Sequence, residues 1–274
     1  MSPEATATRK LPGVLGMPND DPRKIVAVAV LICLVCSVMV SSASVLLKPR
    51  QERNQALAIK GEIVKVSGLD TDGTDVEELF DRIETRIVDL ETGEYADEID
   101  PVTFDPQAAA KDSATSTALS TEEDIAKIKR RANYAPVYLV RDNAELRTII
   151  LPVHGYGLWA TMYGFLALAS DGNAITGITF YKHGETPGLG DEIEDPDWQA
   201  QFAGKQAFDD HGNPRIGLIK GGVNESSADA AFQVDGISGA TLTSNGVTNL
   251  LHFWLGRQGF GPYLQKLKTS GDST

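Results

Sequence analysis

The stretch Leu158–His183 reads LWATMYGFLALASDGNAITGITFYKH and decides the fold class. Two apolar runs, Leu158–Ala169 and Ala174–His183, flank Asp171-Gly172-Asn173. An Asp-Gly turn between apolar runs is a strong short-range signal for a β-hairpin. The sequence therefore predicts two antiparallel strands that meet at this turn.

Strand-like patterns continue on both sides of this hairpin. Upstream, Val137–Arg141 and Glu145–Val153 flank Asp142-Asn143-Ala144 and predict a second hairpin. Downstream, Arg215–Lys220 is a shorter predicted strand that ends in two glycines. Together with the helical patterns described next, these strands predict an α+β fold with an antiparallel-rich sheet and flanking helices.

The stretch Asp235–Val247 reads DGISGATLTSNGV and precedes an amphipathic helix. Apolar residues with the spacing of one buried helix face follow it, namely Val247, Leu250, Leu251, Trp254 and Leu255. Ser244 or Asn245 is expected to cap this helix. Thr243 would then lie just before a helix N-terminus, where the dipole and free N–H groups favour a phosphate. From spacing alone, a turn that only caps the helix is the commoner interpretation.

The loop His183–Gly190 reads HGETPGLG and is the second informative stretch. Its proline stiffens the loop, and its glycines let the backbone lie close to a planar ligand. Glu185 and Thr186 offer an acceptor and a hydroxyl at its tip. The alternatives are an ordinary polar turn with a solvated Glu185, or an acid/base pair with His183, for which no nucleophile provides support. The nearby G-x-G-x-x-A at 155–160 precedes a predicted strand, so a dinucleotide fingerprint is excluded.

An uncharged segment, Ile25–Leu47, lies near the N-terminus. A helix of this length spans about 35 Å, enough for a bilayer core of about 30 Å. The segment is longer than the apolar region of a signal peptide, so a retained transmembrane helix is favoured over cleavage near Ser41-Ser42-Ala43. Four cationic residues precede it and three follow closely, too even a balance to predict its orientation.

Residues 48–135 are predicted to be an acidic, largely helical segment followed by a linker. Fifteen Asp or Glu and three Lys or Arg lie between Glu62 and Asp105, and we expect a solvated helix face there rather than a docking surface for a basic partner. Apolar residues recur at helical spacing behind a possible capping box at Thr74 and Glu77: Val76, Leu79, Phe80, Ile83, Ile87 and Leu90. Asp105–Thr121 reads as a surface linker. A short helix over Glu122–Ala132, capped by Ser120 and Glu123, is expected before a last domain at 136–274.

Composition excludes several classes of function. The formal net charge of −13 argues against a nucleic-acid partner. Both cysteines, Cys33 and Cys36, lie in the uncharged segment, so the remainder has neither a disulfide framework nor a cysteine metal site. The four histidines have no paired ligand spacing, so no metal site is expected.

Several motifs together resemble a known family. SGATLT at Ser238–Thr243 resembles the flavinylation motif [ST]-G-A-[ST]-x-T of FMN-binding domains, and HGETPGLG and Lys220-Gly221-Gly222 look like the two other signature loops of that domain. LICLVCSVMV at Leu31–Val40 and LLKPRQE at Leu46–Glu52 look like the C subunit of the sodium-translocating NADH:quinone reductase. The resemblance covers nearly the whole chain from Asn19 onward.

The resemblance implies a cofactor and a place for it. In that family FMN is joined by a phosphodiester bond to the hydroxyl of the motif's last threonine, here Thr243, by a flavin transferase that uses FAD. Non-covalent contacts to the flavin are then expected from Ser238, Gly239, Ala240, Thr241, Glu185, Thr186, Leu189, Gly190, Lys220 and Trp159. Lys220 is a candidate for the flavin N1–C2=O edge and Trp159 for stacking. No separate catalytic acid or base is expected.

The resemblance also implies a protein complex and a cellular location. The expected function is one-electron transfer in the six-subunit, sodium-pumping reductase that oxidises NADH and reduces ubiquinone. The other five members of that complex are the expected partners, above all its B, D and E subunits. The expected location is the bacterial inner membrane, with residues 1–24 in the cytoplasm, one transmembrane helix and the C-terminal domain in the periplasm. The alternatives are the equivalent FMN protein of the ferredoxin:NAD oxidoreductase complex and an anchored scaffold without redox function.

Overall fold

The computed structural model describes residues 17–69 and 73–270. They fall into two compact units, Met1–Ala56 and Leu57–Thr274. Helix α1 (Pro22–Ser67) contains the expected span, and it is the one helix in the described ranges that is long and apolar enough to cross a membrane. Most of its apolar side chains before Lys48 are exposed, and Ala27 and Val28 are half-buried. Part of the expected N-terminal tail, residues 1–16, lies outside the described residues.

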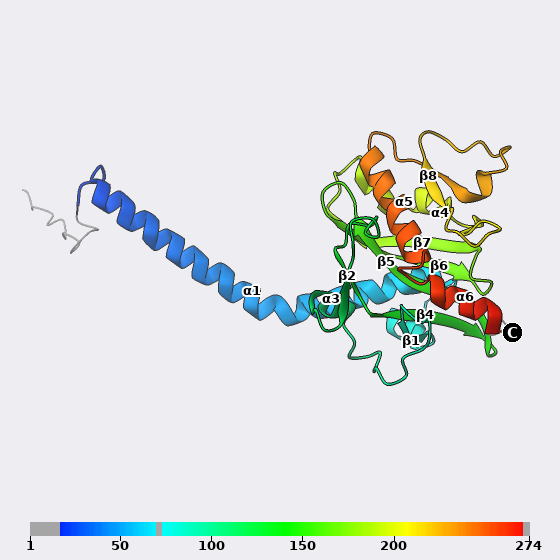
Figure 1. The fold of residues 1–274 in the computed structure, drawn as a ribbon. Coiled ribbons are helices and arrows are strands. Elements are labelled where there is room, and N and C mark those ends of the chain that lie inside the picture. The colour runs from blue at the N-terminus through cyan, green and yellow to red at the C-terminus, as the bar shows by residue number, and fades with distance from the viewer. Residues whose placement is uncertain (1–16, 70–72, 271–274) are drawn as a thin grey trace, which may run out of the picture. The chain divides into compact units, whose positions relative to one another are not determined.

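A five-stranded antiparallel sheet forms the centre of the second unit (Figure 1). Its strand order is β1-β4-β5-β6-β7. The bounds are β1 Glu84–Asp89, β4 Tyr134–Asp142, β5 Glu145–Tyr156, β6 Thr161–Ala169 and β7 Ile175–Lys182. Both predicted hairpins are confirmed as β4–β5 and β6–β7, and the α+β fold class is confirmed with them.

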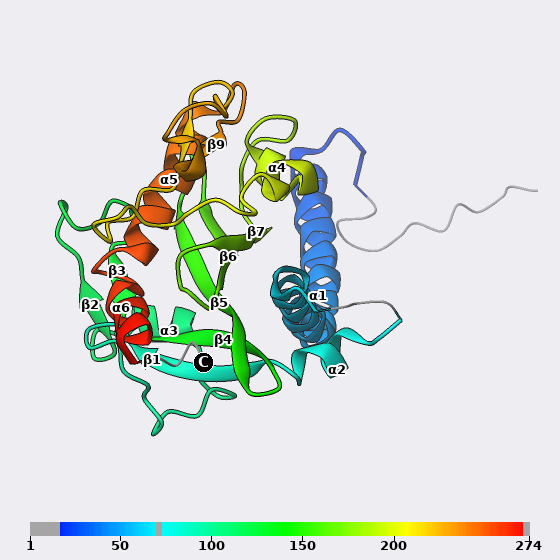
Figure 2. The same ribbon diagram turned by 90° about the vertical axis from the view of Figure 1, so that its right-hand side faces the viewer.

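The two faces of this sheet carry separate apolar cores. Helices α5 (Thr241–Leu255) and α6 (Gly261–Ser270) pack on one face, where Leu151, Leu166 and Leu250 are fully buried. Residues 57–67 of α1 and the short helix α2 (Val76–Phe80) pack on the other face, with Ile63 and Leu79 buried against Phe165. Figure 2 shows the sheet between these two sets of helices.

The acidic segment folds differently from the prediction. Helix α2 ends at Phe80, and its N-cap is Asp75, whose side chain accepts from the Glu77 N–H at 3.4 Å. The predicted continuation of a helix to Leu90 is wrong, because Glu84–Asp89 forms the edge strand β1 and pairs with β4. Apolar spacing suits either structure here, and backbone pairing with β4 decides it. The predicted domain boundary at residue 136 stays a prediction. Strand β1 lies before it and strand β4 crosses it, and both belong to one compact unit.

The segment from Asp105 to Ala132 also differs from expectation. The expected linker contains helix α3 (Pro106–Lys111) and strand β2 (Ser116–Ala118), which pairs with β3 (Arg130–Ala132). The predicted capping contact exists, since the Ser120 N–H and Oγ both donate to Glu123 Oε2, at 3.1 and 2.7 Å. No helix follows it, because Lys127 and Lys129 adopt left-handed φ angles of 55° and 67°.

Short elements connect β7 to the C-terminal helices. They are the 3₁₀ helix η2 (Gly190–Glu194), α4 (Pro196–Ala200), β8 (Gly217–Ile219), the 3₁₀ helix η3 (Ala230–Phe232) and β9 (Gln233–Asp235). Strands β8 and β9 pair in parallel as a separate two-stranded sheet. The predicted strand at Arg215–Lys220 is confirmed in its central part, and the predicted buried face of the following helix is confirmed in α5.

Candidate functional site

The two informative loops of the sequence meet at one hydrogen bond. Oγ1 of Thr243 donates to Oε2 of Glu185 at 2.5 Å. Thr243 is 0% exposed and Glu185 is 5% exposed, although both residue types are polar. A buried carboxylate has to be matched by donors, so this contact ties the loop after β7 to the first turn of α5.

Glu185 also binds the turn between β5 and β6. Both of its carboxylate oxygens accept from the Leu158 N–H, at 3.0 and 3.2 Å, and Oε1 accepts from the Trp159 N–H at 3.2 Å. Trp159 Nε1 in turn donates to Thr186 Oγ1 at 3.0 Å. Three segments far apart in the chain therefore converge on one carboxylate.

Two glycines make this convergence possible. A Cβ atom at Gly190 would lie 2.8 Å from Thr243 Oγ1 and 2.9 Å from Glu185 Cβ. A Cβ atom at Gly157 would lie 2.5 Å from Glu185 Oε1. Real Cβ atoms do not approach so closely, so any side chain at these positions would force the three segments apart.

The start of α5 differs from the prediction in one respect. The helix begins at Thr241 with Ala240 as its N-cap, and no side chain caps it. Ser244 is not the cap, because its Oγ lies inside the first turn, where it accepts from the Ile237 N–H and donates to the Ala240 carbonyl. Thr243 is thus in the first helical turn, where the helix dipole and unpaired N–H groups favour an anion.

Large apolar side chains stay exposed around this buried pair. Trp159 is 64% exposed, Leu242 59% and Leu189 44%. Leu189 lies over the turn before α5, since a Cβ atom at Gly239 would be 3.0 Å from its Cδ2. Gly239 itself has a φ of +75°, which favours glycine. Exposed aromatic and aliphatic groups beside a polar anchor suit a planar ligand with one polar end.

The remaining polar residues predicted to contact the flavin are Ser238, Thr241 and Lys220. Ser238 and Thr241 are both exposed beside the buried Ala240, and Lys220 is exposed after β8. Among the described residues, no hydrogen bond joins Lys220 to Thr243 or Glu185. The sequence analysis missed three parts of the site: the peptide N–H groups of Leu158 and Trp159, and the exposed side chain of Leu242. No sequence motif gives these groups a role.

His183 has a structural role in this loop. Its Nδ1 accepts from the Glu185 N–H at 3.1 Å, and its Nε2 lies 2.9 Å from Glu194 Oε1. Both ring nitrogens of His183 therefore bind groups of the 185–194 segment. The imidazole does not contact the Glu185 carboxylate, as an acid/base pair would require. Within residues 17–69 and 73–270, no group of three or more His, Cys, Asp or Glu side chains is arranged to hold a metal ion.

Comparison with known proteins gives the class of protein first. A family model described as the FMN-binding domain matches residues 157–256, a range that contains the turn, the loop and the α5 start described above. The globular part therefore contains a region, residues 157–256, that is similar to FMN-binding domains. Its site residues fit that cofactor, because a hydroxyl, a glycine turn and an open helix N-terminus suit a phosphate while exposed apolar groups suit a planar ring.

Relatives across the whole chain give the particular family. The chain is 51% identical over 254 residues to the C subunit of the Na(+)-translocating NADH-quinone reductase from Pseudomonas aeruginosa, covering 91% of this chain and 97% of that protein. It is 49% identical to the corresponding protein from Vibrio vulnificus, covering 92% and 98%. The chain belongs to this family, the C subunits of the Na(+)-translocating NADH-quinone reductase.

Solved structures agree in fold. The crystal structure of Shewanella oneidensis NqrC superposes with a TM-score of 0.71 at 37% identity, covering 77% of this chain and 96% of that one. The C subunit of the reductase from Parabacteroides distasonis gives a TM-score of 0.61 at 29% identity, covering 80% and 96%. The resemblance noted in the sequence is thereby confirmed, and family membership implies that the protein works with other members of the reductase complex.

Proposed function

We propose that this protein carries FMN covalently, through a phosphodiester bond to Oγ1 of Thr243, and passes electrons one at a time within the reductase. The observation that carries the proposal is the position of Thr243. It is the last residue of SGATLT, and it lies in the first turn of a helix that no side chain caps. FMN supplies the redox chemistry when it is bound, and the protein supplies binding and orientation.

The proposal requires the loop over Thr243 to move. In the structure the Thr243 hydroxyl is buried and donates to Glu185, and Gly190 lies against it. A phosphate group therefore has no room at Oγ1 until residues 185–190 shift. A carboxylate beside a phosphodiester would also repel it, so we expect Glu185 to turn away when FMN is attached.

We propose the non-covalent flavin contacts from the residues that surround Thr243. Trp159 and Leu189 would lie against the isoalloxazine ring, with Thr186 and Gly190 beside the ring or the ribityl chain. Ser238, Gly239, Ala240 and Thr241 would give the phosphate its space, and Lys220 would approach the ring edge from the end of β8. A flavin transferase would attach the FMN from FAD: the FAD pyrophosphate bond breaks, the Thr243 hydroxyl loses its proton as Oγ1 bonds to the FMN phosphorus, and AMP leaves.

The location follows from the anchor and from the cofactor. A single N-terminal apolar helix agrees with a single-pass membrane anchor. We place residues before Lys24 in the cytoplasm and the globular part in the periplasm, where covalent attachment keeps a small cofactor from being lost. The B subunit of the reductase, and its membrane-embedded D and E subunits, would be the nearest partners.

Intact mass of the full chain tests the attachment. Protein from a host that contains the transferase should be heavier by one FMN residue and should fluoresce on a denaturing gel. Thr243→Val should lose both signals. Thr269→Val is the matched control, because Thr269 is an exposed threonine on α6, outside the motif, and it should keep them. Flavin retained by Thr243→Val would exclude Thr243 as the attachment site.

A further inference from the structure

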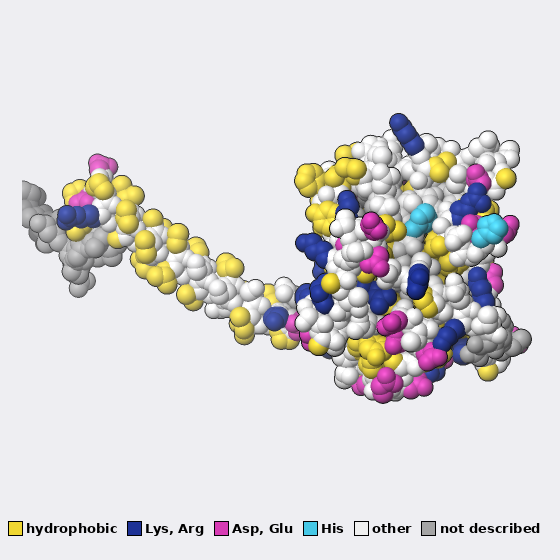
Figure 3. All heavy atoms as spheres, in the orientation of Figure 1, with side chains coloured by type: hydrophobic (Ala, Val, Ile, Leu, Met, Phe, Trp, Pro, Cys, Tyr) yellow, Lys and Arg dark blue, Asp and Glu magenta, His cyan; other side chains and the backbone are white. Residues whose placement is uncertain are grey.

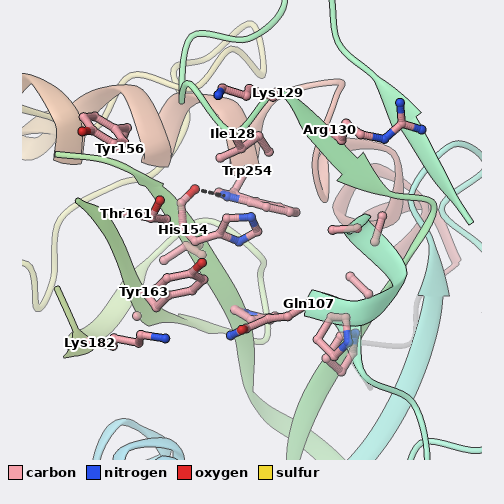
Figure 4. Close-up of a pocket in the computed structure, with 18 of the residues that line it drawn as sticks. Gln107, Ile128, Lys129, Arg130, His154, Tyr156, Thr161, Tyr163, Lys182 and Trp254 are labelled. Atoms are coloured by element: carbon pink, nitrogen blue, oxygen red, sulfur yellow. Dashed lines mark hydrogen bonds between the residues drawn. The ribbon is translucent and has the colours of Figure 1, made fainter. Parts of the chain in front are cut away.

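A cavity distinct from the candidate flavin site lies beside the β5–β6 hairpin, and Trp254 of α5 is part of its lining. Its volume is about 640 Å³, within the range of small-molecule sites. The walls come from α3, the loop 127–130, the β5–β6 hairpin and the end of β7. Neither Thr243, Glu185, Trp159 nor Leu189 lines it. Figure 4 shows its centre, where Trp254 and His154 lie between Lys182 and Lys129.

The cavity is positively charged in an acidic protein. Five cationic residues line it, and no Asp or Glu does: Lys111, Lys127, Lys129, Arg130 and Lys182. The chain as a whole has 38 acidic and 25 basic residues. Within the described ranges, no carboxylate oxygen lies within 4.0 Å of the ammonium or guanidinium nitrogens of these five side chains. Figure 3 shows Lys and Arg side chains near α3 and β2, with Asp and Glu side chains beside them on the outer surface. Such a distribution selects an anion.

The backbone places two of these lysines in an unfavourable conformation. Lys127 and Lys129 have φ angles of 55° and 67°, a region that glycine or asparagine adopts at lower cost. Asp124 holds this loop, since its carboxylate accepts from the Ile128 N–H and the Lys129 N–H, both at 2.8 Å. Strained positions of this kind cluster at ligand sites.

The floor of the cavity is aromatic and uncharged. Trp254 Nε1 donates to the His154 carbonyl, and the His154 ring stacks on Tyr163 with ring centroids 5.5 Å apart. The Lys182 ammonium lies 5.3 Å from the centre of the Tyr163 ring. Burial lowers the pKa of His154 to about 4, so its imidazole is neutral near pH 7. An apolar floor under a cationic rim matches a molecule with one anionic end and one hydrocarbon end.

We propose that this cavity binds an anionic phospholipid, with the phosphate at Lys127 and Lys129 and part of an acyl chain over Trp254 and Tyr163. The candidate transmembrane helix is the reason to choose a lipid, because a domain tethered to a bilayer meets lipid at high effective concentration. Each lysine near a phosphate contributes an attraction that falls with ionic strength.

Native mass spectrometry of the full chain in a nonionic detergent tests the proposal. Three probes are compared: phosphatidylglycerol, phosphatidylcholine with the same acyl chains, and sn-glycerol 3-phosphate. We expect one retained phosphatidylglycerol, bound roughly tenfold more tightly than phosphatidylcholine. The double variant Lys127→Gly/Lys129→Gly should weaken this binding about tenfold, while folding is preserved because glycine accepts both φ angles.

The matched control is Lys266→Gln/Lys268→Gln on α6, which removes the same charge outside the cavity. It should bind phosphatidylglycerol as the wild type does. The anchor is unchanged in both double variants, so lipid held by the anchor cannot produce a difference between them. Equal retention of the two phospholipids, or equal binding by the glycine variant and the control, would overturn the proposal. Tighter binding of sn-glycerol 3-phosphate than of phosphatidylglycerol would assign the cavity to a soluble phosphate instead.

Discussion

Replacement of Glu185 by alanine tests the convergence at the candidate site most directly. The Glu185 carboxylate accepts hydrogen bonds from the Leu158 N–H, the Trp159 N–H and the Thr243 hydroxyl. Glu185→Ala removes both of the carboxylate oxygens that accept these hydrogen bonds. It leaves three donors without a protein partner in a region where Thr243 is fully buried.

The expected loss of stability follows from these contacts. A hydrogen bond to a charged group contributes about 1.5–3 kcal/mol, and removal of the buried carboxylate recovers part of its desolvation cost. Since water can reach the exposed Trp159 side of the gap, we expect a net loss of about 3 kcal/mol. For a domain of roughly 150–250 residues this lowers Tm by about 6–12 °C.

Thermal and urea unfolding of the full chain in detergent, followed by circular dichroism, measures this loss. Glu194→Ala is the control, because the Glu194 carboxylate pairs with the loop histidine rather than with Thr243 or the 158–159 turn, and its side chain is 54% exposed. It should cost less than about 1 kcal/mol. A double-mutant cycle with Thr243→Val should give a coupling energy of about 1.5–3 kcal/mol. The reasoning would be refuted if Glu185→Ala and Glu194→Ala had equal Tm values, or if the coupling energy were zero.

Three further predictions concern the glycines, the buried histidine and the lysine loop. Gly190→Ala should destabilise the fold by about 1–3 kcal/mol, because its Cβ would meet Thr243 Oγ1 at 2.8 Å. Gly177→Ala is the control and should change stability little, since the atom nearest to its Cβ would be 3.8 Å away. Equal midpoints of urea unfolding for the two variants would contradict this prediction. His154 has a pKa lowered to about 4 by burial against about 6.5 when unfolded, so the unfolded state binds the extra proton and stability should fall by roughly 3 kcal/mol from pH 7 to pH 4. His154→Phe should remove that part of the pH dependence, and an unchanged slope in urea titrations would show that another group carries it. Asp124→Ala should cost about 1–2 kcal/mol and speed hydrogen exchange at the Ile128 and Lys129 amides, and unchanged exchange there would mean that the loop does not depend on this carboxylate.

The elements with local signals were predictable from the sequence. The turn at Asp171-Gly172-Asn173 specifies its own hairpin, because Gly172 takes the positive φ of 64° that the turn needs. The buried face of α5 follows from the spacing of Val247, Leu250 and Trp254 alone. The uncharged run in α1 likewise predicts a span from its length and composition. In each case neighbouring residues carry all the information.

Other features depend on partners that are distant in the chain. Ile87 fits a helical period as well as a strand, and only the open edge of β4 makes β1 a strand. Residues 58 positions apart form the bond between Glu185 and Thr243, and the cavity draws its cations from segments between Lys111 and Lys182.

The sequence by itself therefore determined the candidate membrane span, the hairpins, the family and the threonine on which the proposed attachment rests. The tertiary structure decided that this threonine is buried under Glu185, and that five cations share one aromatic cavity. The physical reason is range: turn chemistry and periodicity act over a few residues, whereas burial and charge pairing depend on which segments the completed fold brings together.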